Sequence, residues 1–173
     1  MRKMGIAGAM AAMGMAITAA CARPAAVPAA GGASAMPADS IVLERTRCYG
    51  FCPAYRLVLA RTGEVRFRSV WPEDTPPGEG TVAARDFDGL VAEAARAGFW
   101  SLPDEIQGSA LCPAASTDSP SAIVAIYLPG RSKRVSDYHG CRDEAALAAL
   151  RAFEDRIDSV AGSRRWIRTP ATR

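Results

Sequence analysis

Alternating apolar and polar positions predict three strands in the first half of the chain. These segments are rich in β-branched and aromatic residues and cover residues 41–46, 55–60 and 64–70. Thr62-Gly63 is a tight-turn signal between the last two strands, because glycine accepts a positive φ without penalty. Proline, glycine and acidic residues indicate a loop at 71–80, and a short strand is expected at 81–84.

Two later segments have helical spacing. The first helix is expected to begin with Asp86 as its N-cap and to stop at Gly98, with a core-facing side made of Phe87, Leu90, Val91 and Ala94. The longest helix is expected from Asp143 to Ala161. Its apolar stripe, which can lie on a sheet, consists of Leu147, Leu150, Ile157 and Val160.

A hairpin separates the two predicted helices. Residues 121–128 have the clearest strand pattern, Pro129-Gly130 fits the centre of a type II turn, and residues 132–138 return as the partner strand. The order of strands, helix, hairpin and helix predicts an α+β fold. We expect an antiparallel sheet of about four to six strands with two helices on one face.

The first twenty-one residues have the layout of an export signal. Arg2 and Lys3 form a basic start, Met4 to Ile17 is an uncharged run, and small residues lead into Cys21. This layout resembles a bacterial lipoprotein signal, in which the cysteine is acylated and becomes the mature N-terminus. Ordinary cleavage without a lipid and an uncleaved anchor helix stay open as alternatives. All three possibilities place the domain outside the cytoplasm.

The export signal also sets the expected domain boundaries. We assign residues 1–20 to the signal peptide, 21–39 to a flexible Ala/Pro/Gly tether, 40–167 to a single domain and 168–173 to a disordered tail. Removing the signal peptide takes away two of the 21 basic residues and none of the 18 acidic ones, which leaves a net charge of +1. This balance gives no reason to expect nucleic acid as a partner.

The cysteine count points to disulfide bonds. If a lipid occupies Cys21, an even number of cysteines remains in an exported chain, and two disulfides are expected among Cys48, Cys52, Cys112 and Cys141. Of the three possible pairings we favour Cys48 with Cys52, whose short loop contains a glycine, and Cys112 with Cys141. Closing the second, longer loop would contribute about 3 kcal/mol in a chain-entropy treatment.

The same cysteines allow two kinds of chemistry. Cys48 and Cys52 could form a redox pair near basic side chains, but thioredoxin-type motifs have two intervening residues and precede a helix. Zinc could be held by Cys48, Cys52, Cys141 and His139, although an oxidising compartment and an unpaired Cys112 weigh against it. We therefore favour structural disulfides and no metal.

His139 is the only histidine, so a histidine-dependent hydrolase would have to use it. Asp118, Asp137 or Ser136 could approach it as partners, but no G-x-S-x-G nucleophile pattern is present. We assign no catalytic residue. Asp118 and His139 are kept as candidate ligand-binding residues.

Three segments resemble an uncharacterised family of bacterial envelope domains, many of them predicted lipoproteins. They are R-T-R-C-Y-G-F-C-P-A-Y at 45–55, T-D-S-P at 117–120 and H-G-C at 139–141. The resemblance extends from about Ile41 to Trp166. It implies a fold and a location, and it transfers no activity.

Together these observations predict a non-catalytic envelope lipoprotein without a cofactor, anchored through Cys21 on the periplasmic or outer-membrane face. Its partner would be an unknown envelope protein or ligand. The alternative is an extracytoplasmic thiol-redox or metal-dependent enzyme that uses Cys48, Cys52 and His139, and soluble secretion is the alternative location.

Overall fold

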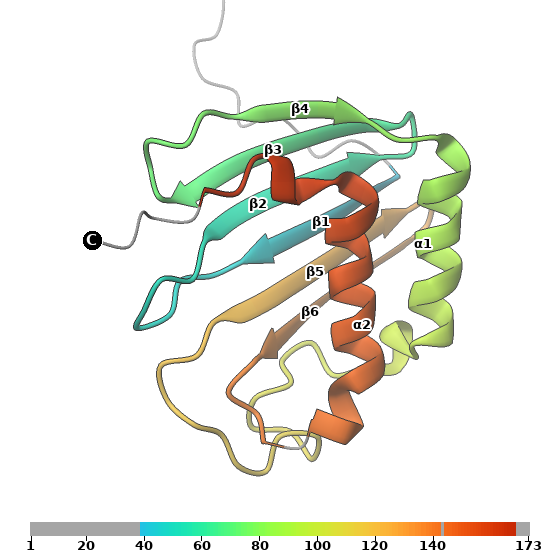
Figure 1. Ribbon diagram of the computed structural model, residues 1–173. Helices are drawn as coiled ribbons and strands as arrows, with labels where there is room; N and C mark the ends of the chain where they lie inside the picture. The colour runs from blue at the N-terminus through green and yellow to red at the C-terminus, as the bar shows by residue number, and fades with distance from the viewer. Residues whose placement is uncertain (1–38, 143, 169–173) are drawn as a thin grey trace, which may run out of the picture. The chain divides into compact units, whose positions relative to one another are not determined.

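The computed structural model describes residues 39–142 and 144–168, which form one open six-stranded antiparallel sheet covered on one face by two helices (Figure 1). The predicted α+β class is confirmed. The strand order is β4-β3-β2-β1-β5-β6. The elements are β1 (Ser40–Arg45), β2 (Ala54–Ala60), β3 (Glu64–Trp71), β4 (Gly78–Thr81), α1 (Ala84–Arg96), β5 (Ser121–Leu128), β6 (Arg131–Tyr138) and α2 (Glu144–Ala161).

The predicted signal peptide, the lipid site at Cys21 and the tether up to residue 38 lie outside the described residues. Among the residues that are described, neither helix has the length and apolar character needed to span a membrane.

Two predicted element boundaries are wrong. The short strand expected at 81–84 is instead β4, which lies three residues earlier at Gly78–Thr81 and pairs with β3. The first helix begins at Ala84 with Ala83 as its N-cap, so Asp86 is the third helical residue and its carboxylate accepts the Ala83 N–H at 3.1 Å. An acidic side chain in the first turn also interacts favourably with the helix dipole.

The core lies between the sheet and the two helices. Strand alternation turns one side of β1, β2, β3 and β5 toward the helices, and α2 contributes its apolar face. Phe153 of α2 packs edge-on against Phe99, with ring centroids 5.9 Å apart. The other large side chains that are fully buried include Phe67, Phe87, Ile41, Leu43, Leu57, Leu59, Leu90, Ile106, Ile126 and Leu147.

At the C-terminal end of the described chain, Trp166 folds back onto the sheet. Its ring stacks on Phe67 with centroids 5.4 Å apart and lies over Gly78 of β4. A Cβ atom on Gly78 would collide with this ring, so the glycine is required by close packing.

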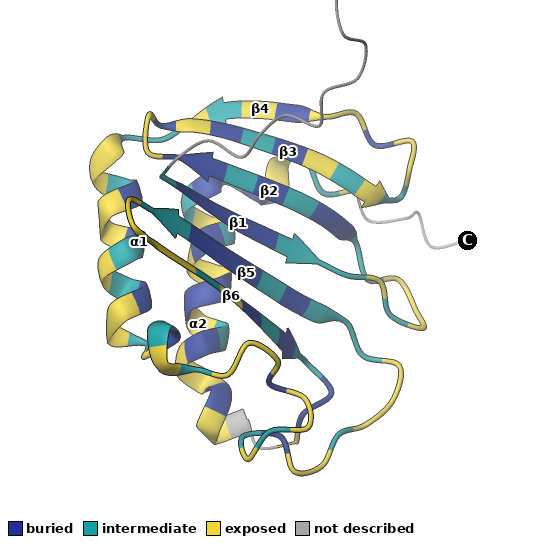
Figure 2. Cartoon of the chain, turned by 180° about the vertical axis from the view of Figure 1, so that it is seen from behind, coloured by how far each residue is buried: buried dark blue, intermediate teal, exposed yellow. Residues whose placement is uncertain are grey.

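Among the described residues, no helix covers the opposite face of the sheet (Figure 2). Two glutamate–arginine ion pairs lie on it, Glu44 with Arg56 and Glu64 with Arg66. Arg56 and Arg68 are cross-strand neighbours in the β2–β3 register. Charged side chains on this face are typical of the solvated side of a half-buried sheet.

Phe153→Ala should lower the free energy of unfolding by about 3–5 kcal/mol, because it removes a buried ring and leaves a cavity between α2 and the sheet. The matched control is Phe51→Ala, since the Phe51 side chain is 74% exposed. That control should cost less than about 1 kcal/mol. Urea unfolding of both variants checks this, and equal losses would contradict the assigned core.

Candidate functional site

A row of side chains across four strands marks the end of the apolar core. The sheet register pairs Tyr55 with Arg45, Arg45 with Ala122, and Ala122 with Asp137. These residues therefore lie side by side on the helix-covered face of β2, β1, β5 and β6. The next row along the same strands is apolar, and it consists of Leu57, Leu43, Val124 and Val135.

α2 places a second set of polar side chains opposite this row. Arg151, Glu154 and Asp158 are spaced by three and four residues, so they lie along one side of the helix. Glu154 and Asp158 both contact Arg45 of β1, and Arg151 contacts Asp137 of β6. The helix therefore faces the sheet with an apolar stripe and an adjoining charged stripe.

Arg45 connects β1 to α2 through three carboxylates. Its guanidinium lies 3.3 Å from Glu154 Oε2, 3.1 Å from Asp158 Oδ2 and 2.9 Å from Asp155 Oδ1. Burial by itself lowers the pKa of Arg45, but the Asp158 and Glu154 carboxylates more than offset this effect, and the net pKa is raised. Arg45 is therefore a fixed positive charge at this end of the domain.

Asp158 is held by two hydroxyl groups as well. Tyr55 donates to Asp158 Oδ1 at 2.7 Å, and Ser163 donates to the same oxygen at 2.6 Å. Burial and the neighbouring Asp158 carboxylate raise the pKa of Tyr55, so its hydroxyl stays protonated and acts as a donor.

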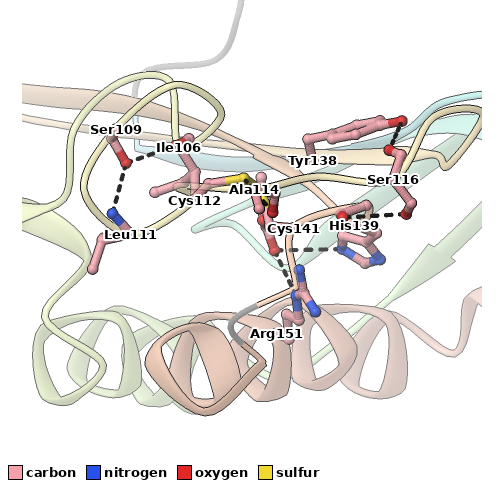
Figure 3. The surroundings of a disulfide bond; sticks show 12 residues. Ile106, Ser109, Leu111, Cys112, Ala114, Ser116, Tyr138, His139, Cys141 and Arg151 are labelled. Atoms are coloured by element: carbon pink, nitrogen blue, oxygen red, sulfur yellow. Dashed lines mark hydrogen bonds and ion pairs between the residues drawn. A yellow bond between two sulfur atoms is a disulfide. The ribbon is translucent and has the colours of Figure 1, made fainter.

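His139 lies between two buried carboxylates. Its Nε2 is 2.9 Å from Glu154 Oε2 and 3.6 Å from Asp137 Oδ2, and Arg151 donates to that same Asp137 oxygen at 3.0 Å. Figure 3 shows the His139 ring and Arg151 close to Cys141. The Glu154 side chain is 1% exposed and that of Asp137 0%, so both carboxylates depend on these partners.

The environment of Glu154 disfavours its ionised form. Burial raises the pKa of Glu154, and hydrogen bonding from His139 and the charge of Arg45 oppose this rise without cancelling it. A buried carboxylate of this kind needs polar partners, and Glu154 has the Arg45 guanidinium on one side and the His139 ring on the other.

Two disulfide bonds brace the loops around this network. Cys48 is joined to Cys52 and Cys112 to Cys141, which are the pairs that the sequence favoured. With these sulfur atoms in disulfides, the cysteines cannot act as zinc-binding thiolates, and the Cys3His arrangement around His139 is not formed.

A pocket of about 280 Å³ lies beside the network and the first disulfide. All three segments that carry the sequence resemblance contribute to it, although they are far apart in the chain. Its lining consists of Arg45, Thr46, Cys52, Pro53, Tyr55, Pro120, Ser121, His139, Asp155, Asp158 and Ile167.

The two candidate ligand-binding residues have different positions. His139 lines the pocket, and its backbone N–H donates to the Pro120 carbonyl at 2.9 Å. Asp118 lies on an exposed turn with a φ of +68°, and its carboxylate accepts a hydrogen bond from Thr117 at 3.0 Å. The structure thus brings the two segments together, and the His139 ring points toward Glu154. A ligand-binding role for Asp118 stays a prediction.

Sequence reasoning missed Arg45, Glu154 and Arg151 as members of the site. A signal for Glu154 was present, because it falls seven residues after Leu147 and seven before Ala161, in phase with the apolar stripe of α2. A carboxylate at such a position must be buried against the sheet or must interrupt the stripe. Asp137, in contrast, is one of the predicted neighbours of His139, and its Oδ2 lies 3.6 Å from His139 Nε2.

These features define a small α+β domain with two disulfides and a charged pocket at one end of the sheet. The chain belongs to a family described as a domain of unknown function (DUF6438), which matches residues 39–161. No curated protein matches the chain.

Arg45→Gln should lower the free energy of unfolding by about 3 kcal/mol near neutral pH, because it leaves Glu154 buried without its guanidinium partner. Arg134→Gln is the matched control. Its ion pair with Glu105 has side chains that are 50% and 62% exposed, and its loss should cost less than about 1 kcal/mol. Chemical denaturation distinguishes the two, and a small effect of Arg45→Gln would contradict its role as the link between sheet and helix.

Proposed function

We propose that the chain is a non-catalytic lipoprotein of the bacterial cell envelope that binds a partner protein through the loop between β1 and β2. The proposal includes export by residues 1–20 and acylation of Cys21. The two disulfides support an oxidising compartment, because such bonds rarely persist in the cytosol.

The observation that carries the binding proposal is the exposure of two aromatic rings on a braced loop. Tyr49 is 89% exposed and Phe51 is 74% exposed, and they stand between the two cysteines of the Cys48–Cys52 disulfide. Large apolar side chains on a soluble domain are costly to hydrate, and aromatic residues are frequent at the centres of protein interfaces.

Neighbouring contacts extend and stiffen this aromatic surface. Phe51 lies against Trp71 with ring centroids 5.8 Å apart, and the Arg47 guanidinium lies 5.3 Å from the same Trp71 ring. The Tyr49 N–H donates to the Asp118 carbonyl at 3.1 Å. A loop that is already ordered loses less conformational entropy when it binds, which favours affinity.

The direction of β1 favours a protein partner over the anchoring membrane. Asp39 precedes β1 and the aromatic loop follows it, so the two lie at opposite ends of the sheet (Figure 1). A domain tethered through the residues before Asp39 is held at the end away from Tyr49 and Phe51. The aromatic surface is therefore at the end of the domain opposite the point where the tether enters.

The alternative of a thiol-redox enzyme has less support. Cys48 and Cys52 are joined, and the loop that carries them connects two strands and does not precede a helix N-terminus that would stabilise a thiolate. The short loop instead serves as a brace that fixes the aromatic side chains.

A photo-crosslinking amino acid at position 51, in cells that export the full chain, should give one discrete crosslinked protein. The same amino acid at Arg85 is the control, because this residue is exposed in the first turn of α1 and lies at the end of the domain that carries Asp39. Adding Tyr49→Ser should weaken the crosslink from position 51. Crosslinks to lipid, equal products from both positions, or no product from position 51 would contradict the proposal.

A further inference from the structure

We propose that Asp137, His139 and Glu154 bind one divalent transition-metal ion, as a site separate from the aromatic loop. Each residue offers one ligand atom, and the three atoms all lie within 4.8 Å of one another. One imidazole nitrogen with two carboxylate oxygens suits zinc and neighbouring first-row metals, whereas calcium and magnesium prefer oxygen ligands alone.

The distances between the donor atoms fit a shared ion. His139 Nε2 lies 2.9 Å from Glu154 Oε2 and 3.6 Å from Asp137 Oδ2. Zinc lies about 2.0–2.2 Å from nitrogen and oxygen ligands, which places neighbouring donors roughly 3.0–3.5 Å apart. Small side-chain rotations are therefore enough to bring the three donors around one ion.

The charge of the cluster also favours a cation. Two guanidinium groups, Arg45 and Arg151, face four carboxylates, so the acidic groups outnumber the arginines by two. The four carboxylates are those of Asp137, Glu154, Asp155 and Asp158. A divalent ion would compensate this excess where two of the carboxylates are fully buried.

A second, independent observation comes from unpaired oxygen atoms. Asp137 Oδ1 and Glu154 Oε1 are buried and have no hydrogen-bond partner among the described residues. Buried carboxylate oxygens are nearly always paired, so these two oxygens are available to a ligand. A metal ion could be bound by either oxygen of each carboxylate.

The arginines are compatible with such a site. Arg45 and Arg151 each donate to one carboxylate oxygen of the cluster, at 3.3 and 3.0 Å. A carboxylate oxygen has more than one lone pair, so it can accept a hydrogen bond and bind a metal ion at the same time. The two arginines would then orient the ligands from outside the coordination sphere, as outer partners do in known metal sites.

The ion would have a route into the cluster. The His139 side chain is 26% exposed and lines the pocket of about 280 Å³, whereas the carboxylates lie behind it. An entry path is one of the requirements for a functional metal site. His139 would therefore be the ligand nearest to solvent.

The test is a zinc titration by calorimetry. The full chain, purified in detergent with both disulfides intact and treated with EDTA, should bind one zinc ion per chain. His139→Gln should weaken the binding by at least about tenfold, since it removes the nitrogen ligand. Asp104→Asn is the matched control, because this carboxylate pairs with Lys133 away from the cluster, and it should leave zinc binding unchanged.

Two results would overturn the proposal: no saturable zinc binding, or the same affinity in the wild type and His139→Gln. A second measurement uses the wild type alone, so the test does not depend on whether His139→Gln folds. The chain loaded with Co²⁺ should have visible absorption bands stronger than those of aqueous Co²⁺, and a spectrum identical to the aqueous ion would also overturn it. Because no partner protein is present, the outcome is independent of the crosslinking experiment.

Discussion

The contact of Arg45 with Glu154 is the interaction on which this end of the domain depends. It joins the last residue of β1 to the middle of α2, and the Glu154 carboxylate then reaches His139 and, through it, the end of β6. A buried ion pair adds little net stability, because desolvation offsets the attraction between the charges. Its larger effect is on specificity, since this alignment of helix and sheet gives each of the buried carboxylates Glu154 and Asp137 an arginine partner.

The same network fixes the register of the strands. Side chains alternate between the two faces of a strand, so a slip of one residue in β1 would turn Arg45 to the open face and bury Glu44 among apolar groups. Asp137 in β6 would lose Arg151 after a similar slip. The charged row therefore opposes misalignment more strongly than the apolar rows, in which one aliphatic residue can replace another.

The two disulfides hold the loops that adjoin the charged network. Cys112–Cys141 ties the long segment between α1 and β5 to the residues that follow His139. Cys48–Cys52 closes the loop that follows Arg45. Both bonds therefore stabilise segments next to the charged network, where few apolar side chains are available to hold them.

The sequence was sufficient to predict the parts of the fold that depend on local pattern. β5 has the predicted bounds of residues 121–128, and Gly130 has the positive φ that its turn requires. The predicted position of β4 was wrong by three residues, because glycines add nothing to an alternation of apolar and polar side chains. The strand depends on pairing with β3 and on the Trp166 ring, which are contacts between distant parts of the chain.

The site was less predictable for the same reason. The participation of His139 could be expected, since it is the only histidine, but its partners come from a helix whose alignment on the sheet no local pattern specifies. In the sequence, no local pattern distinguishes Arg45 from other charged residues near the end of a strand. Its role follows from the register across β2, β1, β5 and β6, which brings Tyr55 and Asp137 into the same row.

The most direct test of the central claim, an exported lipoprotein braced by two disulfides, is the intact mass of the chain purified from its native membrane. The mass is measured with and without reduction and alkylation. We predict loss of residues 1–20, acyl groups on Cys21, and alkylation of the four other cysteines only after reduction. An unmodified Cys21, or cysteines that alkylate before reduction, would contradict the claim.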